Sequence, residues 1–431
     1  MIKLQKLGIV VGSLMVLVAC GNGDTDTGEE VTENGTEETN NNGETEQLSG
    51  TIEVGVGENY TGFIEEIAPA FEEEYGVEVI ITERDMFETL EALTLDGPAG
   101  LAPDVILSPY DRIGGLGQQG QLAEITLPSD RNDEIDEQQV TVGGTIYGSP
   151  FVIESLVMYY NRDLLDEAPT TFEELEELAE DDRFSFAGEP GTSTAFLANW
   201  VDFYNSYGLI SGYGGYVFGD DGEDPSDIGL NSPGAVEGIE YAQYWFQEIW
   251  PDGMLDVTSA GNFIDDQFIQ ESAAAIINGP WGASNYVEAG VNFGVAPIPT
   301  LPNGNAYEPF AGGKGWVIPS YSENVDAAQA FIDFVNNEEN TMLLYTDFTG
   351  EIPANQNTRN TIIEDGEDEL AIAVIEQYNE SVPMPNIPEM SGVWQGAESM
   401  MFDAGSGNKT AQEAADNAVE VIKTNIEQIY N

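Results

Sequence analysis

The hydrophobic pattern of the chain predicts strands that alternate with helices. Residues 51–56 alternate between apolar and polar side chains, which is typical of a strand. Apolar residues at helical spacing follow between 64 and 75, and Gly76 marks the end of that helix. A second strand is expected at 77–81. Because strand, helix and strand follow one another, we predict an α/β fold with helices on both faces of a mostly parallel sheet.

One apolar run is followed directly by three side chains suited to ligand binding. Residues 105–107 predict a strand buried on both faces, which residues 108–109 end. Tyr110, Asp111 and Arg112 come next, in what we expect to be a loop. Ligands of open α/β sheets bind beyond the carboxyl ends of strands, and a ring, a carboxylate and a guanidinium suit a polyhydroxylated ligand. The alternative is a local Asp–Arg ion pair that closes the loop.

Two further positions place a conspicuous side chain beside a predicted strand. The apolar run at 152–161 contains one carboxylate, Glu154, and burying an unpaired charge is unfavourable. We therefore expect Glu154 to face a cleft; an exposed edge strand is the alternative. Residues 273–277 predict another strand, which ends at an Asn-Gly-Pro turn before Trp281. The large indole of Trp281 should cover either a ligand or the turn itself.

Other segments predict structural elements rather than a site. Thr171 is expected to be the N-cap of a helix, with Glu174 three residues later. A short strand is expected at 184–187. Aromatic residues between 200 and 207 fall at helical spacing, which favours a helix packed in the core over a ligand platform. A last amphipathic helix is expected at 411–429.

The N-terminus has the features of a secretory signal. Lys3 and Lys6 precede an apolar run at 7–19, which is too short for a comfortable membrane span. Cys20, the only cysteine of the chain, follows that run, so no intrachain disulfide is possible. Residues 21–49 contain almost no apolar side chains, and we expect a flexible acidic tether there.

Composition and charge narrow the classes of partner. The 431 residues exceed one ordinary core and suggest two domains. With 79 acidic residues, 11 basic residues and no His, the formal net charge is −68, which argues against a nucleic-acid partner because phosphate contacts need Lys and Arg. One Cys and no His argue against structural zinc, and the acidic turn at 220–224 lacks a calcium-loop pattern. Our hypothesis for the charge is a protein that faces concentrated salt; a merely acidic surface is the alternative.

Several motifs, in a fixed order, resemble the bacterial maltose/maltodextrin-binding family, the substrate-capturing components of sugar ABC importers. The motifs are Asp-Arg-Ile-Gly from Asp111, Gly-Gly-Tyr-Val-Phe from Gly214, Asn-Gly-Pro-Trp ending at Trp281, Pro-Ala-Asn at 353–355, and the proline-rich segment 383–394. The resemblance covers about residues 50–430. The run Leu-Val-Ala-Cys-Gly around Cys20 also resembles the bacterial lipobox, in which that cysteine becomes lipidated.

The resemblance implies a two-lobed periplasmic-binding-protein-like α/β fold of type II, with mixed sheets flanked by helices. It implies a lipoprotein signal peptide at 1–19 and an acidic disordered tether at 20–49. The implied first lobe is 50–153 with 313–364, the second lobe is 157–309 with 368–431, and hinge crossings fall near 153–157, 309–313 and 364–368.

The resemblance also implies a ligand site between the lobes, with indole and phenol rings from opposite halves gripping a sugar. Its residues are Glu58, Asn59, Tyr60, Tyr110, Asp111, Arg112, Glu154, Glu189, Pro190, Trp281, Met384, Trp394 and Glu398. Trp281 and Trp394 are expected to stack on sugar rings, and Met384 to line the cleft. The chain departs from the family pattern at Asn59, Ser108, Gly191 and Glu398, where the compared member has Lys, Trp, an aromatic residue and Arg.

What the resemblance implies in function is a lipid-anchored extracellular binding protein that delivers maltodextrin-type oligosaccharides to the permease subunits of an ABC importer. It implies a monomer attached to the membrane through Cys20, with no catalysis, cofactor, metal or nucleic acid. The alternatives are a binding protein for cyclodextrins or galacto-oligosaccharides, a secreted acidic glycoside hydrolase, and an anchored sensor or adhesin. The departures from the family pattern at Asn59, Ser108, Gly191 and Glu398 leave the choice of sugar open.

Overall fold

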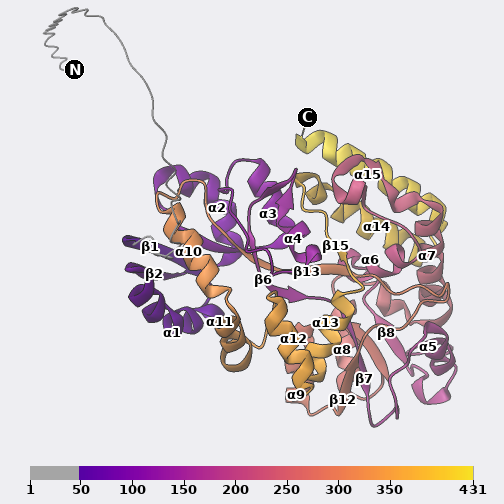
Figure 1. Cartoon of the computed structure of the whole chain (residues 1–431). Helices are drawn as coiled ribbons and strands as arrows, with labels where there is room; N and C mark the ends of the chain where they lie inside the picture. Colours follow the sequence, from indigo (N-terminus) through magenta and orange to yellow (C-terminus); the bar gives the residue numbers. More distant parts are fainter. Residues whose placement is uncertain (1–47, 431) are drawn as a thin grey trace, which may run out of the picture. The chain divides into compact units, whose positions relative to one another are not determined.

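The computed structural model describes residues 48–430, which belong to one compact unit. The predicted signal peptide, Cys20 and almost all of the predicted tether lie outside the described residues. Figure 1 shows two sheets in this unit, with β1 and β2 toward one end, β7 and β12 toward the other, and β6 and β13 between them.

The larger sheet is mixed, with strand order β14-β6-β13-β3-β1-β2 and β15 paired to β13. Its strands are β1 (Gly50–Val56), β2 (Val77–Glu83), β3 (Val105–Pro109), β6 (Ser149–Glu154), β13 (Phe310–Val317), β14 (Ile352–Pro353) and β15 (Val382–Pro383). β1 is parallel to β2 and β3, as the sequence predicted. β13 runs antiparallel to β3 and β6, so the expectation of a mostly parallel sheet is wrong for this half.

The smaller sheet has the order β12-β7-β11-β8. Its strands are β7 (Val157–Asn161), β8 (Phe196–Ala198), β11 (Ala275–Asn278) and β12 (Phe293–Ala296), and two-stranded pairs form from β4 (Thr141–Val142) with β5 (Thr145–Ile146) and from β9 (Phe218–Gly219) with β10 (Asp224–Ile228). The apolar run predicted as one strand at 152–161 is two strands, because β6 ends at Glu154 and β7 begins at Val157 in the other sheet. The lobe boundaries remain a prediction.

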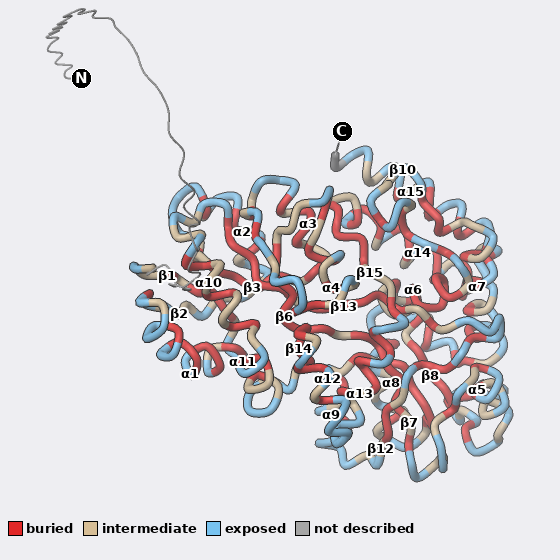
Figure 2. The backbone as a smooth tube through the Cα atoms, viewed as in Figure 1, coloured by how far each residue is buried: buried red, intermediate tan, exposed pale blue. Residues whose placement is uncertain are grey.

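Helices cover both sheets. They are α1 (Glu58–Tyr75), α2 (Met86–Ala99), α3 (Tyr110–Gln118), α4 (Glu134–Gln139), α5 (Phe172–Ala179), α6 (Phe203–Gly212), α7 (Pro233–Tyr244), α8 (Ala260–Ile269), α9 (Ala283–Ala289), α10 (Val325–Val335), α11 (Glu338–Leu343), α12 (Gln356–Asp365), α13 (Glu369–Tyr378), α14 (Trp394–Gly405) and α15 (Ala411–Tyr430). Figure 2 shows buried backbone along the strands and exposed backbone on the outer helices. Within residues 48–430, no helix has both the length and the apolar run that a membrane crossing requires.

The sequence predicted the helix boundaries at Gly76 and Thr171 correctly, but it placed a loop and a strand where the structure has neither. Gly76 ends α1 in the left-handed conformation, with φ of 72°, and the Thr171 hydroxyl caps α5 by accepting from the Glu174 backbone N–H. The expected loop at residues 110–112 is the first turn of α3, and α1 likewise begins at Glu58, directly after β1. These helices start directly after β1 and β3, so their unpaired backbone N–H groups face the carboxyl edge of the sheet. The strand expected at 184–187 is wrong, since only an isolated bridge from Ser185 to Ser193 forms there.

A buried ion pair ties three helices together near the junction of the two sheets. The Arg359 guanidinium on α12 donates to Asp136 on α4 at 2.8 Å, and the carboxylate of Asp136 also accepts from the Tyr378 hydroxyl on α13 at 2.7 Å. Asp136 is fully buried and Arg359 is nearly so. Removing one partner of such a pair leaves an uncompensated buried charge, so this contact should resist disruption.

Candidate functional site

Residues of the larger sheet and of the segment that follows β11 of the smaller sheet line a cavity of about 540 Å³, which we call the Trp281 cavity. The larger sheet contributes Glu154 at the end of β6 and Lys314 on β13, and Glu351 lies just before β14. Trp281 follows β11 of the smaller sheet, on the short turn Pro280–Gly282. Charged groups therefore enter this cavity from one sheet and an indole from the other.

The charged groups of the Trp281 cavity are held by one another. The Lys314 ammonium forms an ion pair with Glu351, and the same carboxylate accepts from the Tyr60 hydroxyl at 2.5 Å. The Lys314 Nζ atom lies 6.0 Å from the centroid of the Tyr60 ring. Burial, followed by the charge of Glu351, raises the pKa of the Tyr60 hydroxyl well above its ordinary value. Tyr60 is therefore a permanent donor to Glu351, and the cluster fixes the lysine.

Glu154 lies in the same electrostatic environment. Burial raises the pKa of its carboxyl above the ordinary value, Lys314 opposes that shift, and Glu351 and Asp111 add to it. Glu154 lines the cavity, so the expectation that it faces a cleft rather than an exposed edge fits the structure. A partly exposed carboxyl at this position can accept hydrogen bonds from hydroxyl groups.

Two rings, Tyr204 on α6 and Phe310 on β13, connect Trp281 to Trp394. The Trp281 ring centroid lies 6.3 Å from that of Tyr204, Tyr204 lies 6.2 Å from Phe310, and Phe310 lies 6.3 Å from Trp394. Trp281 is 51 % exposed, whereas Trp394 is half-buried at the start of α14. Trp281 therefore offers an open face, and the rings behind it restrict its movement.

The Tyr110, Asp111 and Arg112 side chains do not act as one trio. Tyr110 is 1 % exposed, so it offers no face for stacking. Burial raises the pKa of the Asp111 carboxyl above its ordinary value, and the charge of Arg112 only partly opposes that shift. The Arg112 guanidinium lies over the Phe87 ring, 5.1 Å from its centroid, and within the described chain it forms no ion pair, so the alternative of an Asp–Arg pair closing a loop is not observed.

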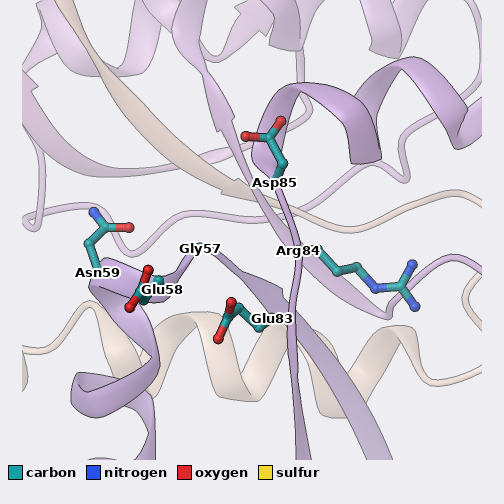
Figure 3. Close-up of a pocket in the computed structure, with 6 residues that line it drawn as sticks. All are labelled: Gly57, Glu58, Asn59, Glu83, Arg84 and Asp85. Carbon is teal, nitrogen blue, oxygen red and sulfur yellow. The ribbon is translucent and has the colours of Figure 1, made fainter.

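Two smaller hollows continue from the Trp281 cavity along the carboxyl edge of the larger sheet. The first, the Tyr60 cavity, has a volume of about 200 Å³ and is lined by Asn59, Tyr60, Arg84, Phe87 and Lys314 among others. Lys314 therefore lines both this cavity and the Trp281 cavity. A second hollow of about 490 Å³ is lined by Gly57, Glu58, Asn59, Glu83, Arg84 and Asp85. Figure 3 shows that the Arg84 side chain there extends away from Glu58 and Asn59.

Four predicted site residues lie elsewhere. The Glu189 carboxylate accepts from the Asp252 backbone N–H at 2.9 Å, and Pro190 is exposed beside it; neither is among the residues that line the cavities above. Met384 lines a separate hollow of about 290 Å³. Glu398 lies near Asp202, and its pKa is raised by burial and by that carboxylate. The structure gives no support for Glu189 and Pro190 as part of the cleft.

Sequence reasoning missed three side chains of the site. Lys314 is the one charged residue in the strand Phe310–Val317, and the argument applied to Glu154 would have found it. Tyr204 was included among the core aromatics, yet its ring contacts Trp281 and its buried hydroxyl has no hydrogen-bond partner in the described chain. Glu351 carried no signal, because its partners Lys314 and Tyr60 are far from it in sequence.

No group of three or more Cys, His, Asp or Glu residues in the described part of the chain could hold a metal ion. The arrangement offers instead an exposed indole, two carboxylates, the Lys314 ammonium group and the Arg84 side chain around connected hollows. Such groups bind hydroxyl-rich, uncharged molecules by stacking and hydrogen bonding.

Comparisons with known proteins agree with this chemistry. Residues 56–342 match the family described as bacterial extracellular solute-binding protein. A maltodextrin-binding protein of Bacillus subtilis (strain 168) is 56 % identical over 379 residues, covering 88 % of this chain and 90 % of that protein. A maltooligosaccharide ABC transporter solute-binding lipoprotein of Streptococcus pneumoniae (strain ATCC BAA-255 / R6) is 47 % identical over 426 residues, covering 98 % and 97 % of the two chains.

A solved structure also matches closely. The maltose-binding periplasmic protein of Listeria monocytogenes in complex with maltose is 57 % identical, with a TM-score of 0.86 over 89 % of this chain and 99 % of that chain. The predicted type II periplasmic-binding-protein fold is thereby confirmed. From the family match and these relatives, the chain belongs to the bacterial extracellular solute-binding proteins.

Proposed function

We propose that this protein captures maltodextrin-type oligosaccharides outside the cell and delivers them to the permease of a carbohydrate ABC importer. The observation that carries the proposal is the exposed face of Trp281 opposite the Glu154, Lys314 and Glu351 cluster. A glucose unit has an apolar face for the indole and hydroxyls at its rim for the charged groups. The ligands named for the related proteins of Bacillus, Streptococcus and Listeria support the same choice.

The proposed closure mechanism follows from the fact that the side chains of the site come from two different parts of the protein. Trp281 comes from the smaller sheet, and Glu154 and Lys314 come from the larger sheet. A sugar that contacts both groups favours the arrangement in which they are close, which is ligand-driven hinge closure. The permease then recognises the closed form.

Isothermal titration calorimetry with maltotriose and maltopentaose tests the ligand. We expect saturable binding of both, and much weaker binding of a galacto-oligosaccharide of the same length. Binding of the galacto-oligosaccharide or of a cyclodextrin in preference to maltotriose would overturn the choice of sugar.

We propose that the protein binds the oligosaccharide without cutting it. Glycosidases use two carboxyl groups, and Glu154 with Glu351 would be the obvious pair here. Glu351 also lines the cavity, but its carboxylate is engaged by the Lys314 ammonium group and the Tyr60 hydroxyl, so it is not an unrestrained nucleophile. Maltotriose incubated with the protein for a day should be recovered intact by chromatography, and release of glucose or maltose would contradict the proposal.

The remaining parts of the proposal concern the cell surface. We propose that Cys20 carries the lipid anchor, that residues 20–49 form the tether, and that the protein acts as a monomer. Metabolic labelling with a fatty-acid analogue should mark the wild-type protein and not a Cys20→Ala variant. Light scattering of the soluble domain should give the mass of one chain, and a dimer mass would contradict the monomer.

A further inference from the structure

Lys314 is the side chain that joins two hollows of the site. It lines both the Trp281 cavity and the Tyr60 cavity. Its neighbours in β13 are Gly312, Gly313 and Gly315, so no other side chain of this stretch projects into either hollow. A sugar chain that extends from Trp281 toward Asn59 must therefore pass the Lys314 ammonium group.

The ammonium group has unused donors. A lysine ammonium carries three N–H donors. In the described chain, Lys314 Nζ donates one hydrogen bond, to Glu351, and Glu351 also accepts from the Tyr60 hydroxyl. The side chain of Lys314 is 20 % exposed, so the remaining donors are accessible from the cavities. The acceptors that suit them are hydroxyl and ring oxygens.

We propose that Lys314 determines ligand specificity by donating hydrogen bonds to the oligosaccharide unit that lies at the junction of the two cavities. Glu351 and Tyr60 act as positioning residues that hold the ammonium group in place. This inference rests on the proposed function, because it assumes an oligosaccharide in the cleft. The competing role is purely electrostatic, in which Lys314 only neutralises Glu351 and Glu154.

A pair of variants separates the two roles. Lys314→Met removes the ammonium group and keeps the length of the side chain. Combining it with Glu351→Gln removes one charge of each sign, so the balance of charge in the cavity is restored while the donor is still missing. By calorimetry with maltotriose, we expect each of these variants to bind about ten-fold more weakly than wild type or worse.

The control is Lys409→Met. Lys409 forms an ion pair with Asp403 at 2.7 Å and is comparably exposed, but it lies outside these cavities. It should leave the affinity for maltotriose unchanged. The melting temperature of each variant identifies any loss of folding, and affinities are compared only among variants that melt like wild type.

The affinity for monodeoxy maltotrioses, each lacking one hydroxyl group, distinguishes a direct hydrogen bond from Lys314 to the sugar from a purely structural role of Lys314. The wild type should lose about ten-fold in affinity for the analogue lacking the hydroxyl that Lys314 contacts, and Lys314→Met should show no further loss with that analogue. Wild-type affinity in Lys314→Met, or in the double variant, would overturn the inference and leave the proposed function standing. Failure of the wild type to bind maltotriose or maltopentaose would overturn both.

Discussion

Replacing Trp281 by alanine should weaken sugar binding strongly and leave the unliganded fold almost unchanged. The Trp281 side chain is 51 % exposed, so about half of its surface is available for a ligand to cover. A tryptophan buries roughly 150–250 Å² when fully covered, which leaves about 100 Å² here. If a sugar ring covers one face, or about half of that area, burial contributes about 1.3 kcal/mol at ~25 cal/mol per Å².

Stacking adds about 0.5–1.5 kcal/mol to burial. The total loss of binding free energy in Trp281→Ala is therefore about 2–3 kcal/mol, which corresponds to a roughly 30- to 150-fold larger dissociation constant. The melting temperature without ligand should change little, because the half-exposed Trp281 ring lies against Gly279 of the preceding turn and near Tyr204, not in the core.

Intrinsic fluorescence provides the assay. Trp200, Trp245, Trp250 and Trp316 are buried, so the emission change on adding maltotriose should come mainly from Trp281, with a smaller part from Trp394. The matched control is Phe402→Ala, which removes an exposed ring on α14 that lines none of the cavities above. An affinity in Trp281→Ala within three-fold of wild type, or the same loss in Phe402→Ala, would refute the reasoning.

Three further predictions concern stability. Raising NaCl from about 0.1 M to about 2 M should raise the melting temperature, because screening reduces the self-repulsion of a chain with net charge −68; a lower melting temperature at high salt would contradict this. Arg359→Met should lower the free energy of unfolding in urea by about 3 kcal/mol because it strands the buried Asp136 carboxylate, whereas Arg183→Met, at an exposed pair, should have no measurable effect. Burial raises the pKa of the Glu154 carboxyl in the folded protein, so the protonated form of Glu154 favours the folded state. The wild type should therefore lose stability as the pH rises above about 4.5, the ordinary pKa, and through the higher pKa of the folded state. Glu154→Gln should remove that part of the pH dependence, which melting curves from about pH 4 to pH 7 would detect, and an unchanged profile would contradict it.

The local elements could be predicted because the signals that set them are local. Gly76 ends a helix and Thr171 begins one through backbone geometry and a single hydroxyl, both visible in a few residues of sequence. The start of α3 could not be placed, because a loop and a helix fit equally well after Pro109, and packing in the fold decides between them. The hydrophobic pattern alone did not show the break after Glu154, since β6 and β7 are both apolar and differ only in the sheet they join; the hinge crossing near 153–157 came from the family resemblance.

Residues of the site could be predicted where the polarity or size of a side chain is unusual for the segment that contains it. Glu154 is a charge in an apolar strand and Trp281 is a large ring after a turn, and both line the cavity. Glu351 has no such conflict, and its place is set by strand register: β6 pairs with both β13 and β14, which brings Lys314 and the residues before β14 together. Glu189, implied by the resemblance alone, accepts from the Asp252 backbone N–H away from these cavities, and its place in the site stays a prediction.

Gly312, on β13, lies between the side chains of Glu154 and Tyr204. A Cβ atom there would be 2.8 Å from Cγ of Glu154, on β6, and 3.0 Å from the Tyr204 hydroxyl, on α6. Bare backbone thus serves as the spacer between a carboxyl group of one sheet and a phenol packed with the other. A methyl group at this position would push Glu154 and Tyr204 apart and favour an open cleft in the unliganded protein. Evolution or design could therefore tune the free energy of closure without altering any side chain that contacts the ligand.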